Sequence, residues 1–133
     1  MDRLVPERRS WLMSRVKGRD TTPELIVRRM LHTEGYRFRL HRKDLPGKPD
    51  IVFPGRRKVV FVHGCFWHGH RCRKGRLPKS NKDFWRTKIG ANRARDRRHL
   101  KGLAALGWKT LVIWQCKLKA PLAARKQIVD FLK

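Results

Sequence analysis

The hydrophobic positions in the first quarter of the chain repeat at helical spacing. Residues 7–16 place apolar side chains among arginines, which predicts a short basic helix that ends near Gly18. A second helix is expected to begin at Thr22, which can cap it, with Pro23 in the first turn and Gly35 as the stop. The apolar positions of this second helix are Ile26, Val27, Met30 and Leu31.

The next segments show the patterns of β-strands. Residues 36–40 alternate apolar side chains with arginines, the period of a strand with one buried face. After a turn rich in proline and glycine, residues 50–53 and 58–62 predict two strands joined by a Pro-Gly turn. Asp50 would then lie near the start of a hairpin whose second strand ends at His63.

The second half of the chain predicts helix, strand and helix after an irregular loop. Glycines and a proline interrupt residues 63–82, and a long helix is expected from the Ser-x-x-Asp signal at the end of this loop to Gly107. Residues 108–114 predict a buried strand and residues 121–132 a closing helix. The resulting order, α, α, β, β, β, α, β, α, predicts a single α/β domain with a mixed central sheet flanked by helices.

The composition indicates an anionic partner. The 133 residues fit one domain, residues 1–133, and contain 35 Lys and Arg against 10 Asp and Glu, a formal net charge of +25. This excess is far beyond what solubility needs and points to a polyanion. No apolar run approaches the roughly 18 residues that span a bilayer, and no secretory signal is evident. A cytoplasmic protein without a membrane partner is expected.

Three cysteines and a histidine have a spacing that fits zinc. Cys65, His70 and Cys72 lie close together in the irregular loop, and Cys116 follows a predicted strand. Structural zinc takes four tetrahedral sulfur and nitrogen ligands, and an irregular loop of this length needs some form of cross-link. The alternative is that these are unliganded thiols and a surface histidine. We predict a closed, structural zinc site with no open position for a substrate.

Four polar side chains could support chemistry on phosphate esters. Asp50 faces the strand that ends in His63, and its oxygens could bind Mg²⁺. His63 or His68 could take a proton from water or stabilise charge that develops on phosphorus. Glu24, in the first turn of a predicted helix, could orient one of these histidines. Each of the four also has an ordinary interpretation, as a turn, helix-start, packing or surface residue.

Several motifs resemble the very-short-patch-repair (Vsr-type) DNA mismatch endonucleases, over residues 9–117. The most specific is FVHGCFWHGHRC at residues 61–72, preceded by LPGKPD at residues 45–50. The other matching segments are RDTTPE at residues 19–24, FWRTKIGAN at residues 84–92 and DRR at residues 96–98. The resemblance implies a fold related to the PD-(D/E)xK restriction nucleases. It also implies a nick 5′ to the T of a T·G mismatch left by deamination of 5-methylcytosine, which initiates very short patch repair.

The resemblance also implies roles for individual residues. Asp50 would be the Mg²⁺ ligand and His68 the general base, with Glu24 and His63 assisting. Val62 stands where the family often has threonine, which is harmless if the residue gives the metal only its backbone carbonyl. Where the restriction relatives place a carboxylate and a lysine, this chain has Phe61 and His63, as the Vsr-type enzymes do. The implied zinc ligands are Cys65, His70, Cys72 and Cys116.

Aromatic and basic residues form the implied DNA interface. Weak stacking of a T·G pair favours its recognition by aromatic wedges, and the family inserts residues matching Phe66, Trp67 and Trp85. Core packing is the alternative for each of them. Three further aromatic residues are assigned to the core: Phe61, Trp108 and Trp114. Phosphate or base contacts are expected from the long helix, through Lys88, Asn92, Arg93, Arg95, Arg97 and Arg98.

The expected partner is double-stranded DNA that contains a T·G mismatch. The basic segment at residues 1–18 is expected to contact it, and a monomer bound to DNA of the nucleoid is the simplest assembly. The family further suggests a MutL-type repair protein nearby. Two other functions stay open: a zinc-stabilised nucleic-acid-binding module without catalysis, and a restriction-type endonuclease that cuts both strands.

Overall fold

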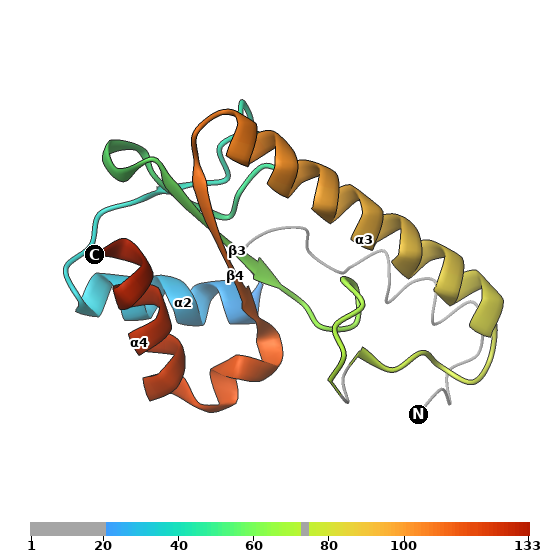
Figure 1. Ribbon diagram of the computed structural model, residues 1–133. Helices are drawn as coiled ribbons and strands as arrows, with labels where there is room; N and C mark the ends of the chain where they lie inside the picture. The colour runs from blue at the N-terminus through green and yellow to red at the C-terminus, as the bar shows by residue number, and fades with distance from the viewer. Residues whose placement is uncertain (1–20, 73–74) are drawn as a thin grey trace.

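The computed structural model describes residues 21–72 and 75–133, which contain three α-helices and a four-stranded sheet (Figure 1). The order of elements confirms the prediction from the second helix onward. The helix predicted at residues 7–16 and the basic segment at residues 1–18 lie outside the described residues. The elements are α2 (Thr22–Thr33), β1 (Arg39–Leu40), β2 (Ile51–Phe53), η1 (Pro54–Arg56), β3 (Lys58–His63), α3 (Lys82–Ala105), β4 (Lys109–Trp114), η3 (Gln115–Lys119) and α4 (Pro121–Leu132).

The sheet is mixed, as predicted, with the strand order β1-β2-β3-β4. β1 and β2 pair antiparallel, as do β2 and β3, whereas β3 and β4 are parallel. The register places Ile51 opposite Val60, and His63 beside Trp114. Because β3 and β4 run in the same direction, their carboxyl ends meet at one edge of the sheet, next to the amino end of β2.

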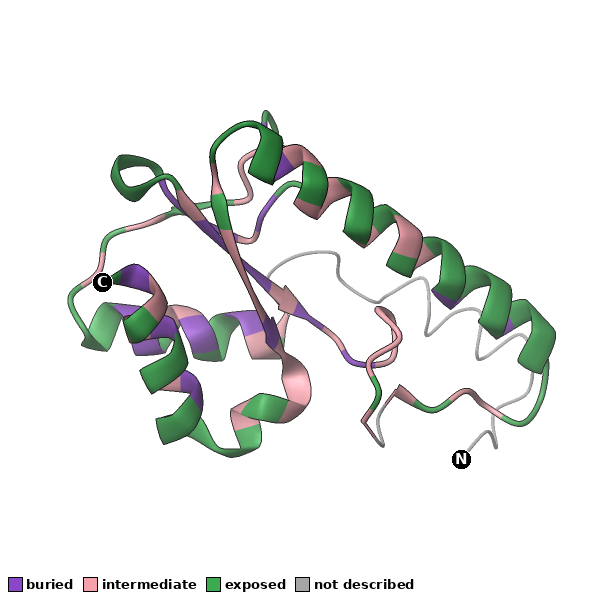
Figure 2. Ribbon diagram, in the orientation of Figure 1, coloured by how far each residue is buried: buried purple, intermediate pink, exposed green. Residues whose placement is uncertain are grey.

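Helices cover both faces of the sheet, with α2 and α4 on one side and α3 on the other (Figure 1). The alternation of side chains along β3 explains this, since Val60 packs with α2 and α4 while Val59 and Phe61 pack with Leu103 of α3. Both faces of β2 are buried, and the outer surfaces of the helices are exposed (Figure 2). The central strands are therefore a rigid base for residues at their ends.

Some predicted boundaries were wrong for local reasons. Thr21 rather than Thr22 caps α2, since its hydroxyl accepts a hydrogen bond from the Glu24 N–H. The strand expected at residues 36–40 is reduced to two residues, because the Tyr36 N–H bonds to the carbonyl of Leu31 and helps to end α2. The chain enters α3 through Asn81, in the left-handed conformation, instead of through the predicted serine cap.

One core assignment also needs correction. Phe61 is buried as predicted, and Trp108, although partly buried, packs against the core cluster that contains Phe61. Trp114 is partly buried and lies outside the core clusters of the described residues, against the rings of His63 and His70. Among the described helices, none combines the length and apolar character needed to cross a membrane.

Candidate active site and metal centre

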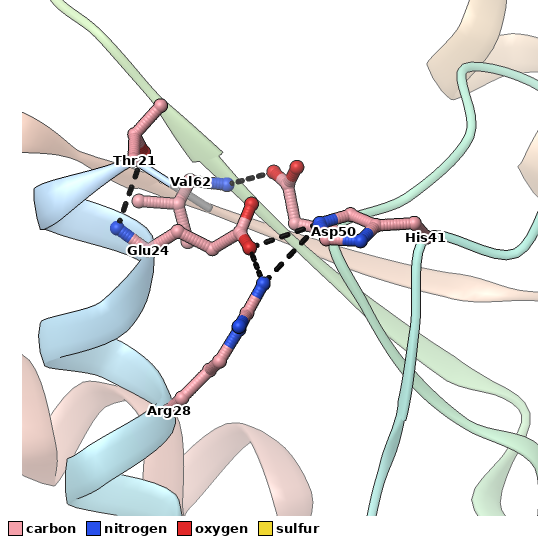
Figure 3. Close-up of polar contacts among 6 residues, drawn as sticks. All are labelled: Thr21, Glu24, Arg28, His41, Asp50 and Val62. Carbon is pink, nitrogen blue, oxygen red and sulfur yellow. Dashed lines mark hydrogen bonds and ion pairs between the residues drawn. The ribbon is translucent and has the colours of Figure 1, made fainter. Parts of the chain in front are cut away.

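Asp50 precedes β2 and reaches across to β3. Its Oδ2 atom accepts a hydrogen bond of 2.7 Å from the Val62 N–H (Figure 3). The predicted juxtaposition of Asp50 with the end of β3 is confirmed. Burial raises the pKa of Asp50, although the hydrogen bond from Val62 opposes this. Nearby charges also lower this pKa, namely those of His41, His68 and Arg28. The carboxylate is therefore held rigidly, in a setting where a cation would favour its ionised form.

Glu24 lies beside Asp50 and has two cationic or polar partners. Its carboxylate is 2% exposed, forms an ion pair with Arg28 one turn along α2, and lies 2.9 Å from Nε2 of His41 (Figure 3). The ligand atoms of Glu24, His41 and Asp50 all lie within 4.8 Å of one another. A buried carboxylate without such partners would be strongly disfavoured, so Arg28 and His41 explain how Glu24 is tolerated here.

The sequence did not point to His41. Its φ angle is 48°, a left-handed conformation that only a few per cent of residues other than glycine adopt. Its N–H donates to the carbonyl of Asp50, which ties the segment after β1 to the start of β2. Arg28 was missed as well, although its position four residues after Glu24 in a predicted helix was a usable signal.

A second polar group joins the end of β3 to α3. The His63 and His68 rings are stacked, with centroids 3.8 Å apart and planes 2° apart. Nδ1 of His68 lies 2.6 Å from Oδ2 of Asp96, a residue of α3. Burial lowers the pKa of His63 to about 4, so this ring is neutral at pH 7. Burial alone would raise the pKa of Asp96, but the His68 hydrogen bond and charge lower it overall.

The carboxylate that pairs with His68 is not the one that was expected. Glu24 was expected to orient His63 or His68, whereas Asp96 bonds to His68 and Glu24 is grouped with His41. A carboxylate on Nδ1 fixes the imidazole tautomer and leaves Nε2 to accept a proton. The position of Asp96 in the DRR motif gave no indication of this pairing by itself.

The four predicted zinc ligands converge. Sulfur and nitrogen atoms of Cys65, His70, Cys72 and Cys116 all lie within 4.8 Å of one another. The Cys116 N–H donates to the Cys65 sulfur at 3.3 Å, and Sγ of Cys116 is 3.5 Å from Nδ1 of His70. Three sulfurs and one nitrogen form a donor set typical of structural zinc. Burial raises the pKa of Cys65 to about 12, because a buried thiolate is unfavourable. A bound cation would offset the free-energy cost of ionising this thiol.

Gly69 lets the loop that carries Cys65, His70 and Cys72 lie against α3. Its φ angle is 64°, and a Cβ atom there would come within 2.7 Å of Ile89 and 2.6 Å of Arg93. The side-chain amide of Asn92 also donates to the carbonyl of Trp67 at 2.9 Å. Asn92 thus supports the loop, a role that the prediction of a DNA contact did not foresee.

The predicted aromatic wedges pack edge to face against one another. Phe66 and Trp67 are partly exposed, with ring centroids 5.1 Å apart. Trp85 is 2% exposed and lies against both, at 5.3 Å and 6.0 Å, so in this conformation it supports them from α3. Five of the predicted DNA-contacting cations are exposed on the same helix: Lys88, Arg93, Arg95, Arg97 and Arg98.

Together these features are typical of one class of protein, the nucleases: a strongly basic α/β domain with clustered carboxylates, paired histidines and partly exposed aromatic rings. A family model described as DNA mismatch endonuclease Vsr matches residues 1–74. The chain belongs to the Vsr family of DNA endonucleases, which confirms the resemblance seen in its motifs.

Individual relatives agree with this assignment. The type II nicking enzyme V.XorIIP of Xanthomonas oryzae pv. oryzae is 66% identical over 117 residues, which cover 88% of this chain and 86% of the relative. The type II nicking enzyme V.NmeAIP of Neisseria meningitidis is 42% identical over 127 residues, 96% of this chain and 91% of the relative. The DNA mismatch endonuclease Vsr of Escherichia coli is 42% identical over 122 residues, 92% and 76% respectively.

Proposed function

We propose that this protein is a strand-specific mismatch endonuclease that nicks DNA 5′ to the T of a T·G mismatch and so initiates very short patch repair. The observation that carries the proposal is a continuous set of contacts. Asp50 accepts a hydrogen bond from the Val62 N–H, the next residue, His63, stacks on His68, and Asp96 bonds to Nδ1 of His68. Membership of the Vsr family supplies the substrate class.

Asp50, with the backbone carbonyl of Val62, would hold Mg²⁺. The donor set fits a hard cation, since it offers carboxylate and carbonyl oxygens, with the Glu24 carboxylate close by. When bound, Mg²⁺ supplies positive charge that stabilises the phosphorane-like transition state and the leaving oxygen. The restriction-nuclease-like fold proposed for the chain agrees with a metal-binding carboxylate at the amino end of β2.

His68 is the proposed general base. Asp96 orients the ring through Nδ1 and stabilises the imidazolium, so Nε2 can accept the proton of the attacking water. His63 lies flat against His68 and is neutral, and therefore limits the movement of His68 without adding a competing positive charge. Glu24 is proposed to assist as a second carboxylate beside Asp50, held in place by Arg28 and His41.

Phe66 and Trp67 are the proposed wedges at the mismatch. They are partly exposed and rest on Trp85, which gives flat rings a rigid support. The exposed cations of α3 would contact phosphates and give the complex a strong salt dependence. We further infer that the protein acts as a monomer on cytoplasmic DNA, with a MutL-type repair protein nearby, as the family suggests.

The proposal is tested with end-labelled duplexes that differ only at one pair, T·G or T·A, within a pool of randomised flanking bases. With Mg²⁺ and zinc-loaded protein, we expect one nick, on the T strand, 5′ to the mismatched T. Cleavage of both strands of the T·A duplex would favour a restriction-type enzyme. Binding without cleavage of any duplex would favour the nucleic-acid-binding module.

An Asp96→Asn variant should nick about 10²-fold more slowly than the wild type in single turnover, with DNA affinity retained. The amide keeps the shape of Asp96 but cannot stabilise a positive charge on His68. Asp130→Asn, an exposed change on α4, is the matched control and should be neutral. A wild-type nicking rate for Asp96→Asn would exclude His68 as a base oriented by this carboxylate.

A further inference from the structure

Trp114 stands between the metal-ligand cluster and the paired histidines. It is the last residue of β4, lies beside His63 in the parallel register with β3, and comes two residues before Cys116. The roles assigned above use the residues on both sides of this tryptophan, but none of them uses the indole itself. The buried-strand pattern of residues 108–114 predicted that Trp114 is a core residue, whereas its ring is partly exposed.

The indole contacts three imidazole rings. It stacks on His70, with ring centroids 4.3 Å apart and planes 19° apart. It meets His63 edge-on at 5.2 Å and 73°, and His68 at 6.4 Å and 71°. One flat side chain therefore touches a proposed zinc ligand and both proposed active-site histidines, in the stacked and edge-on geometries that aromatic rings favour.

The histidines need such a support. Nδ1 of His63 is buried and has no hydrogen-bond partner, so on this side of the ring packing takes the place of a polar contact. The hydrogen bond to Asp96 fixes one atom of His68, about which the ring can still tilt. A general base must be placed accurately to act, because a displacement of about 1 Å can reduce a rate by about 10²-fold.

We propose that Trp114 is a positioning residue that couples the metal-ligand cluster to the general base. Through His70 it is fixed to the cluster, and through His63 and His68 it fixes the tilt of the reacting imidazole. This inference rests on the proposed function, in which His68 takes the proton of water. The proposed zinc site would then have two effects. It would stabilise the fold, and, through Trp114, it would fix the geometry of the active site.

The test compares two substitutions in the zinc-loaded full chain. Trp114→Leu removes the flat face, and its single-turnover nicking rate should fall by about 10²-fold, with the dissociation constant for DNA within about twofold. Trp114→Phe keeps a stacking ring on His70 but is too small to reach all three imidazoles, and should lose about 10-fold. Zinc content should stay at the wild-type level in both variants.

Trp108→Leu is the matched control. This tryptophan precedes the same strand, is also partly buried, and lies under the cations of Arg42 and Arg57, remote from the histidines in the strand register. Its replacement should lower the melting temperature without changing the nicking rate. If Trp114→Leu does the same, or slows nicking only in proportion to zinc lost, the proposal is overturned. A wild-type rate for Trp114→Phe overturns it too, even if Trp114→Leu does not fold.

A spectroscopic measurement separates this inference from the proposed function. In long-range ¹H–¹⁵N spectra of the zinc-loaded protein without DNA, His68 should show one tautomer, protonated at Nδ1, in the wild type. In Trp114→Leu we expect a mixture of tautomers or broadened ring signals. That result would uphold the positioning role even if the wild type failed to nick T·G DNA, whereas unchanged His68 signals would overturn it.

Discussion

An Asp50→Asn variant is expected to lose nicking activity by about 10³-fold or more while it still binds DNA. The asparagine amide keeps the size of the side chain, and its oxygen can still accept the hydrogen bond from the Val62 N–H. It removes the negative charge that would hold Mg²⁺ against the scissile phosphate. Single-turnover nicking of a T·G duplex and fluorescence anisotropy with the same duplex measure the two properties separately.

The control for this variant is again Asp130→Asn, which removes one exposed carboxylate from α4. It corrects for any general effect of making a basic protein more basic. If Asp50→Asn loses DNA affinity and melting temperature together with activity, Asp50 has a structural role. Full activity in Asp50→Asn would exclude this carboxylate as the metal ligand.

Removal of zinc should lower the melting temperature by about 10 °C or more. The four predicted ligands would join the loop after β3 to η3, and the binding energy of a structural zinc ion contributes directly to folding. The expected loss would be seen by differential scanning calorimetry after chelation, and zinc alone should restore the transition. Cys72→Ser should behave like the stripped protein, because serine is a poor replacement for a thiolate ligand.

Magnesium provides the control for chelation. Protein stripped of both metals and then given only Mg²⁺ should keep the low melting temperature, since oxygen-preferring Mg²⁺ does not fit a site of three sulfurs and one nitrogen. Equal melting temperatures for stripped and zinc-loaded protein would show that the cluster holds no structural metal.

Much of the fold could be predicted because its signals are local. The closing helix, residues 121–132, was predicted with the observed boundaries, since its apolar positions repeat at helical spacing between a proline and the end of the sequence. The hairpin that carries Asp50 follows from two short apolar segments and a turn. The four zinc-type ligands converge in the structure as their spacing indicated.

The contacts among side chains could not be predicted in the same way. His41 reaches Glu24 only because the chain turns through a left-handed residue after β1, and no periodic pattern marks that turn. The pair of His68 and Asp96 joins residues 28 positions apart, through the packing of an irregular loop on α3. Trp85 was predicted to face DNA, but it is buried beneath Phe66. This burial depends on the path of the same irregular loop.

The most direct test is a crystal structure of the protein with an uncleaved T·G duplex and Ca²⁺, which occupies oxygen sites and here stands in for Mg²⁺. The account predicts a cation about 2.3–2.6 Å from a carboxylate oxygen of Asp50 and from an oxygen of the phosphate 5′ to the mismatched T, with Nε2 of His68 facing that phosphorus. A complex in which Asp50 lies far from every phosphate would contradict it.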